Sequence, residues 1–192
     1  MKLIFIRHGQ TDWNVRGKIQ GSYDIELNET GIRQAIDLSD KLTKHKYEFK
    51  KIYSSPQKRA LNTAKILSES SNIEYVVIDD LREINMGEWE GLSWKEVDEN
   101  YPTEYKEWKS NRRYTSPPKG ESYEDMLQRV IKALHKIINE NKDDVVIITH
   151  SAVIMCLQCY ITNTPFNKML QFKTTNAEIT EIDSKLLIQT FI

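Results

Sequence analysis

The chain has 192 residues, and its 27 basic and 28 acidic side chains leave a formal net charge of -1. This length suits one domain, 1–192, and the balanced charge gives no reason to expect nucleic acid or a membrane surface as a partner. The first apolar run, residues 3–6, is too short for a signal peptide or a membrane span, so we expect a cytoplasmic protein.

Short apolar runs along the chain predict the strands of a sheet. The runs at 3–6 and 145–149 are continuous, which is typical of strands buried on both faces of a parallel sheet. The full set of expected strands, the last two being weaker, is 3–6, 51–53, 75–78, 145–149, 179–182 and 186–188.

Helical patterns lie between these runs. A first helix is expected after an Asn28 or Thr30 cap, and the clearest stripe begins behind a capping box formed by Ser122 and Asp125. The apolar stripes are Ile32, Ala35, Ile36 and Leu42 in the first helix, Ala60, Leu61, Ala64 and Leu67 in the second, and Met126, Val130, Ala133, Leu134, Ile137 and Ile138 in the third.

The alternation of strand and helix predicts an α/β fold, a three-layer sandwich with a mainly parallel central sheet and helices on both faces. Residues 87–118 break the alternation. They hold three of the four tryptophans and three of the five prolines, and we interpret them as a mostly helical excursion over the sheet edge.

Polar side chains gather where the predicted strands end. Arg7 and His8 follow the first strand, Glu83 lies past the third, and His150 ends the fourth. Ligands of open α/β sheets bind outside the carboxyl ends of the strands, so these residues are expected to share one site. After the second strand, a helix capped by Ser55, with Pro56 at its first position, would bring Arg59 to the same edge.

The residue types at this edge suit one reaction. Arginines beside an imidazole disfavour its protonation, and a neutral imidazole is a nucleophile. Arg7, Arg59 and His150 offer donors to the oxygens of a transferring phosphoryl group, and Gly9 is expected to permit a tight turn close to the ligand. A carboxylic acid would protonate the leaving alkoxide. Phosphoryl transfer through a histidine is therefore the predicted chemistry.

Seven blocks in this order carry a resemblance to a known family. They are Arg7-His8-Gly9-Gln10-Thr11-Asp12-Trp13-Asn14, Ile19-Gln20-Gly21, residues 27–31 with Gln34-Ala35, Ser54-Ser55-Pro56 with Arg59, Leu81-Arg82-Glu83 with Gly87-Glu88-Trp89-Glu90-Gly91, Gly120-Glu121-Ser122, and Thr149-His150.

Together they resemble the histidine phosphatase superfamily, the phosphoglycerate mutase-like phosphatases, over essentially the whole chain. The resemblance implies an α/β sandwich in which His8 is phosphorylated and Glu83 is the proton donor. It further implies that the phosphoryl group is held by Arg7, Arg59 and His150. Asn14 and Gln20 would add contacts to the phosphate or the substrate.

Departures from the family pattern bear on catalysis and on the choice between phosphatase and mutase. Ser151 stands where many relatives have glycine, but its backbone amide can still donate to the ligand. Met86 stands where cofactor-dependent mutases carry a tyrosine, which counts against a mutase. Arg112 and Arg113, by contrast, resemble a substrate-binding arginine pair of those mutases. Their alternative interpretation is a solvated basic turn.

Other motifs predict no cofactor. Cys156 and Cys159 have C-x-x-C spacing but no second pair for zinc, and they lie inside an apolar helix, so we expect buried core thiols and no metal site. No dinucleotide or phosphate-loop fingerprint is present. The leading hypothesis is a phosphomonoesterase acting on small phosphorylated metabolites. The alternatives are an α-ribazole phosphatase of cobamide synthesis, a phosphoglycerate mutase, and a module that binds a phosphorylated ligand without turnover.

Overall fold

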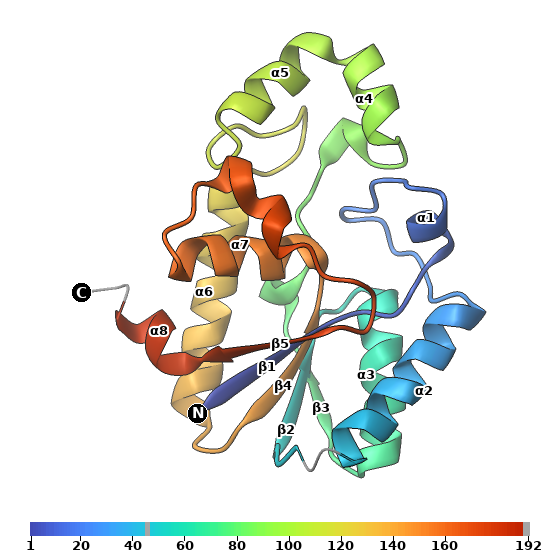
Figure 1. The fold of residues 1–192 in the computed structure, drawn as a ribbon, viewed down its shortest axis with the longest axis vertical. Coiled ribbons are helices and arrows are strands. Elements are labelled where there is room, and N and C mark those ends of the chain that lie inside the picture. Colours follow the sequence, from blue (N-terminus) through green and yellow to red (C-terminus); the bar gives the residue numbers. More distant parts are fainter. Residues whose placement is uncertain (45–46, 190–192) are drawn as a thin grey trace.

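The computed structural model describes residues 1–44 and 47–189 (Figure 1). Its strands are β1 (Lys2–Arg7), β2 (Lys51–Ser54), β3 (Tyr75–Val77), β4 (Val145–Thr149) and β5 (Ile179–Asp183). Its α-helices are α1 (Asp12–Val15), α2 (Glu29–Lys44), α3 (Lys58–Ser71), α4 (Trp94–Asn100), α5 (Pro102–Ser110), α6 (Tyr123–Glu140), α7 (Ser151–Ile161) and α8 (Ser184–Gln189). Three 3₁₀-helices are η1 (Asp79–Leu81), η2 (Gly87–Trp89) and η3 (Phe166–Phe172).

The strands form one sheet in the order β3-β2-β4-β1-β5. β1, β2, β3 and β4 pair in parallel, and β5 runs antiparallel to β1. The register places Arg7 of β1 opposite Thr149 of β4, so the residues that follow these two strands emerge side by side. The predicted mainly parallel sheet is confirmed.

Helices cover both faces of this sheet (Figure 1). Along β1, Leu3 and Phe5 belong to the core shared with α6 and α7, whereas Ile4 and Ile6 belong to the core shared with α2 and α3. Successive side chains of a strand point to opposite faces, so both sets must be apolar when both faces are covered. This explains the continuous apolar runs and confirms the predicted sandwich.

Two predictions about element identity were wrong. Residues 186–188 lie in α8 rather than in a strand, because the Asp183 carboxylate accepts the Lys185 amide and starts a helix that packs Leu187 into the core. A short apolar run cannot by itself distinguish strand from helix. In α2, Ala35 and Leu42 are buried as predicted, together with Leu38, but Ile32 and Ile36 are exposed.

The predicted start of the second helix was also wrong. Its N-cap is Gln57, and α3 begins at Lys58, so Arg59 is the second helical residue. Ser55 is not the cap, and its hydroxyl contacts His150 instead.

The excursion, residues 87–118, contains η2, α4 and α5 and is mostly helical, as predicted. It lies beyond the carboxyl ends of the parallel strands (Figure 1). Ring contacts hold it together, with Trp89 meeting Trp108 and Tyr105 edge-on and Trp94 stacking on Trp108 at 5.3 Å between ring centroids. Across the described residues, none of the helices is long and apolar enough to span a bilayer.

Candidate active site

The ends of β1, β2 and β4 bring His8, Ser55 and His150 together, as the register requires. The imidazole centroids of His8 and His150 are 5.2 Å apart, and the amide of His8 donates to the Thr149 carbonyl at 3.0 Å. Both histidines are almost completely buried. The sequence prediction that distant strand ends share one edge is therefore confirmed.

His8 is held with one ring nitrogen engaged. Its Nδ1 lies 2.7 Å from the Gly9 carbonyl, so this nitrogen carries the proton and Nε2 keeps the lone pair. The pKa of His8 lies well below its usual 6.5, because burial disfavours the imidazolium and Arg59 and Arg7 repel it. His8 is therefore a neutral imidazole at physiological pH.

Gly9 serves a different purpose from the one predicted. Its backbone φ is not positive, so no tight left-handed turn requires a glycine here. A Cβ at Gly9 would instead collide with the carbonyl oxygen of Gly31 at the start of α2. The loop after His8 is thus pressed against α2.

Arg7 and Arg59 lie beside His8 with part of their donor capacity unused. Arg7 donates from Nη1 to the Thr174 carbonyl, and Arg59 donates to the carbonyls of Tyr23 at 2.6 Å and Gly21 at 2.8 Å. The Nε atoms of both arginines are buried without a partner, and burial lowers the pKa of Arg59 to about 10. Buried donors are nearly always satisfied, so these two call for an acceptor supplied by a ligand.

His150 caps α7 and is also left with an open position. Its Nε2 lies 2.8 Å from the Ser55 hydroxyl, whereas its Nδ1 is buried without a partner. Burial, followed by the charge of Arg59, lowers the pKa of His150 well below 6.5. A neutral His150 that accepts from Ser55 carries its proton on Nδ1, which is then a third buried donor without a partner, on a ring next to His8.

Glu83 lies on the coil between η1 and η2. Its Oε1 accepts from the Ile84 amide at 3.0 Å, and its Oε2 accepts from the Ala152 amide at 3.3 Å. Burial raises the pKa of Glu83, although Arg59 and these amides oppose the rise. A raised pKa favours the protonated carboxyl, the form that donates a proton.

Asn14 and Gln20 meet through the Thr11 hydroxyl. The Asn14 Oδ1 accepts from the Thr11 amide and from Asn176 Nδ2, and the Gln20 Oε1 accepts from the Thr11 hydroxyl at 3.0 Å. With their oxygens engaged, the two side chains keep amide N–H groups for the cleft that they line.

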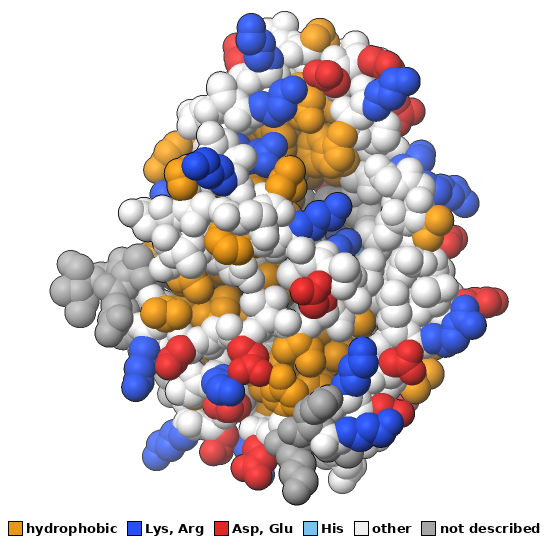
Figure 2. All heavy atoms as spheres, viewed as in Figure 1, with side chains coloured by type: hydrophobic (Ala, Val, Ile, Leu, Met, Phe, Trp, Pro, Cys, Tyr) orange, Lys and Arg blue, Asp and Glu red, His pale blue; other side chains and the backbone are white. Residues whose placement is uncertain are grey.

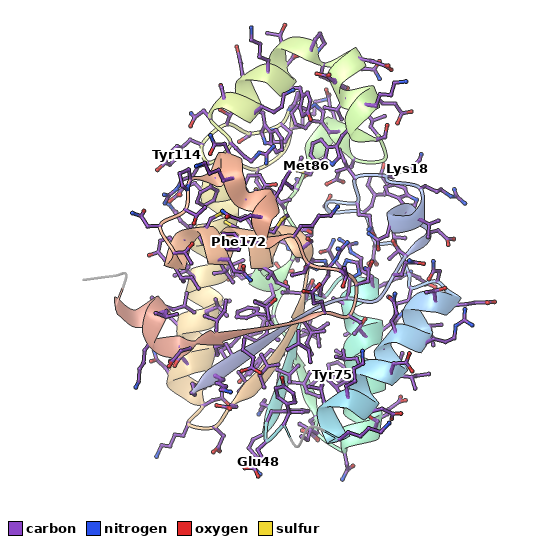
Figure 3. All side chains as sticks on the ribbon, in the orientation of Figure 1. Lys18, Glu48, Tyr75, Met86, Tyr114 and Phe172 are labelled. Carbon is purple, nitrogen blue, oxygen red and sulfur yellow. The ribbon has the colours of Figure 1, made fainter. Side chains whose placement is uncertain are left out.

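A cleft of about 170 Å³ is lined by Arg7, His8, Asn14, Lys18, Gln20, Arg59, Glu83 and Met86 among others. His150 lies next to His8 outside this lining. Figure 2 shows a hollow bordered by Lys and Arg side chains, with hydrophobic side chains above it beneath the excursion. Met86 lies below α4 and Lys18 beside α1 (Figure 3). We call Arg7, His8, Arg59, Glu83 and His150 the cradle.

A second hollow of about 420 Å³ adjoins the cleft, and we call it the chamber. Arg7, Trp94, Tyr123, Ser151 and Met155 line both spaces, so the two share a wall. The chamber's walls are mostly apolar and aromatic and are completed by Tyr105, Trp108, Arg112, Met169, Leu170 and Lys173.

Of the two arginines whose roles the sequence left open, Arg112 lines the chamber and Arg113 does not. Arg112 lies 4.4 Å from the Trp108 ring centroid and has a buried Nε without a partner. Arg113 instead pairs with Glu124 of α6 at 2.5 Å and lies over the Phe166 ring. Neither residue is a simple solvated turn residue.

Sequence reasoning missed several residues around the cradle. Asn176 donates to the His8 carbonyl at 3.0 Å, and Ser55 was interpreted only as a helix cap. Contacts to main-chain carbonyls leave no motif, so nothing in the sequence marks Asn176. The buried thiols of Cys156 and Cys159 were predicted correctly. His45 lies outside the described residues, and His135, expected at the surface, is half-buried.

Comparisons with known proteins agree on one family. The model of the histidine phosphatase superfamily (branch 1) matches residues 3–185. A metal-independent phosphoserine phosphatase of Arabidopsis thaliana is 34% identical over 84% of this chain and 68% of its own. Phosphoserine phosphatase 1 of Hydrogenobacter thermophilus is 31% identical over 95% and 86%, respectively. A mycobacterial glucosyl-3-phosphoglycerate phosphatase, solved with VO3, matches at 29% identity with a TM-score of 0.84, covering 95% of this chain and 90% of that one.

Proposed function

Because the chain belongs to the histidine phosphatase superfamily, we propose that it hydrolyses small phosphomonoesters through a phosphohistidine formed on His8. The observation that carries this proposal is the neutral His8 imidazole, with Nε2 unengaged, beside two guanidinium groups and a protonatable Glu83. The chemistry is that of a phosphoric monoester hydrolase, and the residue roles below are part of the proposal.

In the first step, the phosphate of the substrate occupies the cradle. The unpartnered donors Arg7 Nε, Arg59 Nε and His150 Nδ1 supply its oxygens with hydrogen bonds, and Asn14 and Gln20 add amide N–H groups. His8 Nε2 forms a bond to phosphorus while the bond from phosphorus to the ester oxygen breaks. The protonated Glu83 gives its proton to that oxygen, so the alcohol leaves neutral.

The second step reverses the proton's direction. Glu83, now a carboxylate, takes a proton from water as the water oxygen bonds to phosphorus and the bond to Nε2 breaks. Inorganic phosphate leaves, and both His8 and Glu83 return to their starting protonation states. The cationic donors stabilise the charge on the equatorial oxygens in both steps.

We further propose that the preferred alcohol carries a carboxylate. The chamber adjoins the cleft and is lined by Arg112, whose buried Nε lacks an acceptor. Two of the relatives are named as phosphatases of phosphoserine and of glucosyl-3-phosphoglycerate. Both of these compounds carry a carboxylate near the phosphate. A guanidinium is matched to such a group.

Phosphate release from a panel of esters tests this assignment. Phosphoserine, 3-phosphoglycerate, α-ribazole 5′-phosphate and an aryl phosphate should each be assayed, and 3-phosphoglycerate also with catalytic 2,3-bisphosphoglycerate. We expect the highest kcat/KM for a carboxylated ester. Preference for α-ribazole 5′-phosphate would reassign the enzyme to the cobamide pathway, and binding of every ester without turnover would make it a binding module.

Isomerisation distinguishes a mutase. Met86 lines the cleft where mutases carry a tyrosine, and its thioether cannot donate a hydrogen bond to a bound intermediate. We expect phosphate release to outpace formation of 2-phosphoglycerate. Rapid isomerisation with negligible phosphate release would contradict the phosphatase assignment.

A further inference from the structure

The segment that carries Glu83 has no strand or α-helix to hold it. It runs through coil from the end of η1 at Leu81 to the start of η2 at Gly87. A proton donor must keep its carboxyl within hydrogen-bond reach of one ester oxygen, so this coil has to be fixed by other means.

The side chain of Arg129, from the middle of α6, supplies the main support. Its Nη1 donates to the carbonyls of Asp80 and Arg82, both at 2.8 Å, and its Nη2 donates to the carbonyl of Glu83 itself at 3.1 Å. Its remaining N–H groups bind the Glu121 carboxylate, from Nε at 3.1 Å and from Nη2 at 2.5 Å. All five N–H donors of the guanidinium are therefore used.

Glu121 completes the support from the other side of Glu83. Its Oε1 accepts from the Asn85 amide at 2.9 Å, and its own amide donates to the Asn85 carbonyl at 2.9 Å. The Arg129 and Glu121 side chains are largely buried, with 16% and 21% exposed, so solvent weakens the pair little. The backbone is thus bound at positions 80, 82, 83 and 85.

We propose that Arg129 and Glu121 are a positioning pair for Glu83, setting where its carboxyl meets the ester oxygen. This role depends on the proposed function of Glu83 as proton donor. Lysine cannot replace the guanidinium, because three donors on one nitrogen cannot span three carbonyls and a carboxylate. Neither side chain touches the substrate in this scheme.

A positioning role predicts a loss that depends on the leaving group. An alkoxide is a strong base and needs the proton of Glu83 to leave, whereas an aryl oxide is a much weaker base and needs it far less. Disordered packing of the whole site would lower turnover of both kinds of ester alike. The ratio of kcat/KM between an alkyl and an aryl phosphate therefore separates the two causes.

The test compares p-nitrophenyl phosphate with the best alkyl ester of the substrate panel, in Arg129→Lys, Glu121→Gln and the reference Glu83→Gln. For Glu83→Gln, kcat/KM on the alkyl ester should fall by roughly two to four decades. For the two positioning variants it should fall by roughly 100-fold, the cost of misplacing a reacting group by about 1 Å. On the aryl ester, both variants should lose far less activity, since neither substitution touches the nucleophile or the groups proposed to hold the phosphoryl oxygens, and the aryl leaving group needs little protonation.

Glu124→Gln is the matched control. Glu124 is also a glutamate paired with an arginine at the start of α6, but its partner is Arg113 and not the Glu83 segment. Its ratio of alkyl to aryl activity should stay at the wild-type value. Thermal unfolding reports whether each variant folds. If Arg129→Lys does not fold, the activity ratio of Glu121→Gln alone decides whether the positioning pair is correct.

The outcomes are distinct. If Glu83→Gln loses alkyl activity selectively but both positioning variants lose the two activities equally, or lose neither, the positioning pair is wrong and the proposed function stands. If Glu83→Gln shows no selectivity, the proposed proton donor is wrong, and the inference drawn from it is wrong as well.

Discussion

The cradle and the chamber adjoin, yet they are built in different ways. In the cradle, each side chain is fixed by hydrogen bonds, such as those from His8 to the Gly9 carbonyl and from Arg59 to the Gly21 carbonyl. In the chamber, aromatic rings pack on one another, and the Trp108 Nε1 and Arg112 Nε are buried without partners. Open donors therefore occur in both regions, at Arg7, Arg59 and His150 in the cradle and at Arg112 in the chamber. Side chains fixed by hydrogen bonds suit the reacting phosphate, whereas aromatic walls suit the variable alcohol, so reaction and selectivity are expected to reside in different places.

The largest effect expected in the cradle is that of His8→Ala. Loss of the proposed nucleophile should lower turnover by roughly four decades or more and abolish the acid-labile phosphoryl group trapped after brief mixing with labelled substrate. His135→Ala, in the half-buried middle of α6, should keep the label. Label that persists in His8→Ala would mean that another residue is the nucleophile.

The chamber should respond through KM. Arg112→Ala removes a charged hydrogen bond worth about 1.5–3 kcal/mol, so KM for a carboxylated ester should rise roughly 10- to 100-fold with kcat little changed. The aryl phosphate, which has no carboxylate, should show no change. Arg113→Ala is the control, because Arg113 is paired with Glu124. A fall in kcat for both esters in Arg112→Ala would erase the distinction between the two regions.

The cradle should also make stability depend on pH. An unfolded chain protonates each histidine near pH 6.5, whereas His8 and His150 stay neutral in the folded chain until a lower pH. The unfolded state then binds more protons, so the free energy of unfolding should fall below pH 6.5 by up to about 1.4 kcal/mol per pH unit for each histidine. Urea unfolding of His8→Ala should show a shallower slope. An unchanged slope would contradict the depressed pKa of His8.

A chelator should have the smallest effect. In the proposed mechanism, the arginines and His150 supply the charge stabilisation that a metal ion provides in other phosphatases. Hydrolysis of the aryl phosphate should therefore continue unchanged after incubation with EDTA and dialysis. A rate lost on chelation and restored by magnesium would show that the cradle is incomplete as described.

The sequence predicts the cradle far better than its supports. Strand ends meet at one edge of a parallel sheet, so Arg7, His8 and His150 could be brought together from their spacing alone. Ser55 contacts the His150 ring, whereas Asn176 and Arg129 donate to main-chain carbonyls. Every residue has a main-chain carbonyl, so only the folded backbone determines which carbonyls lie near these donors. The apolar run at 186–188 likewise fits strand or helix until Asp183 starts α8.

The position of β1 between β4 and β5 has a consequence for the timing of synthesis. Its two neighbours, β4 and β5, follow all the other described strands in the chain, and the His8 carbonyl finds Asn176 only 168 positions later. Such long-range pairing folds slowly, because the loop must close before the contact forms. A nascent chain therefore carries the proposed nucleophile, His8, at the end of an unpaired apolar strand until β4 has been synthesised. Only when both β4 and β5 have emerged does that strand lose its exposed edges.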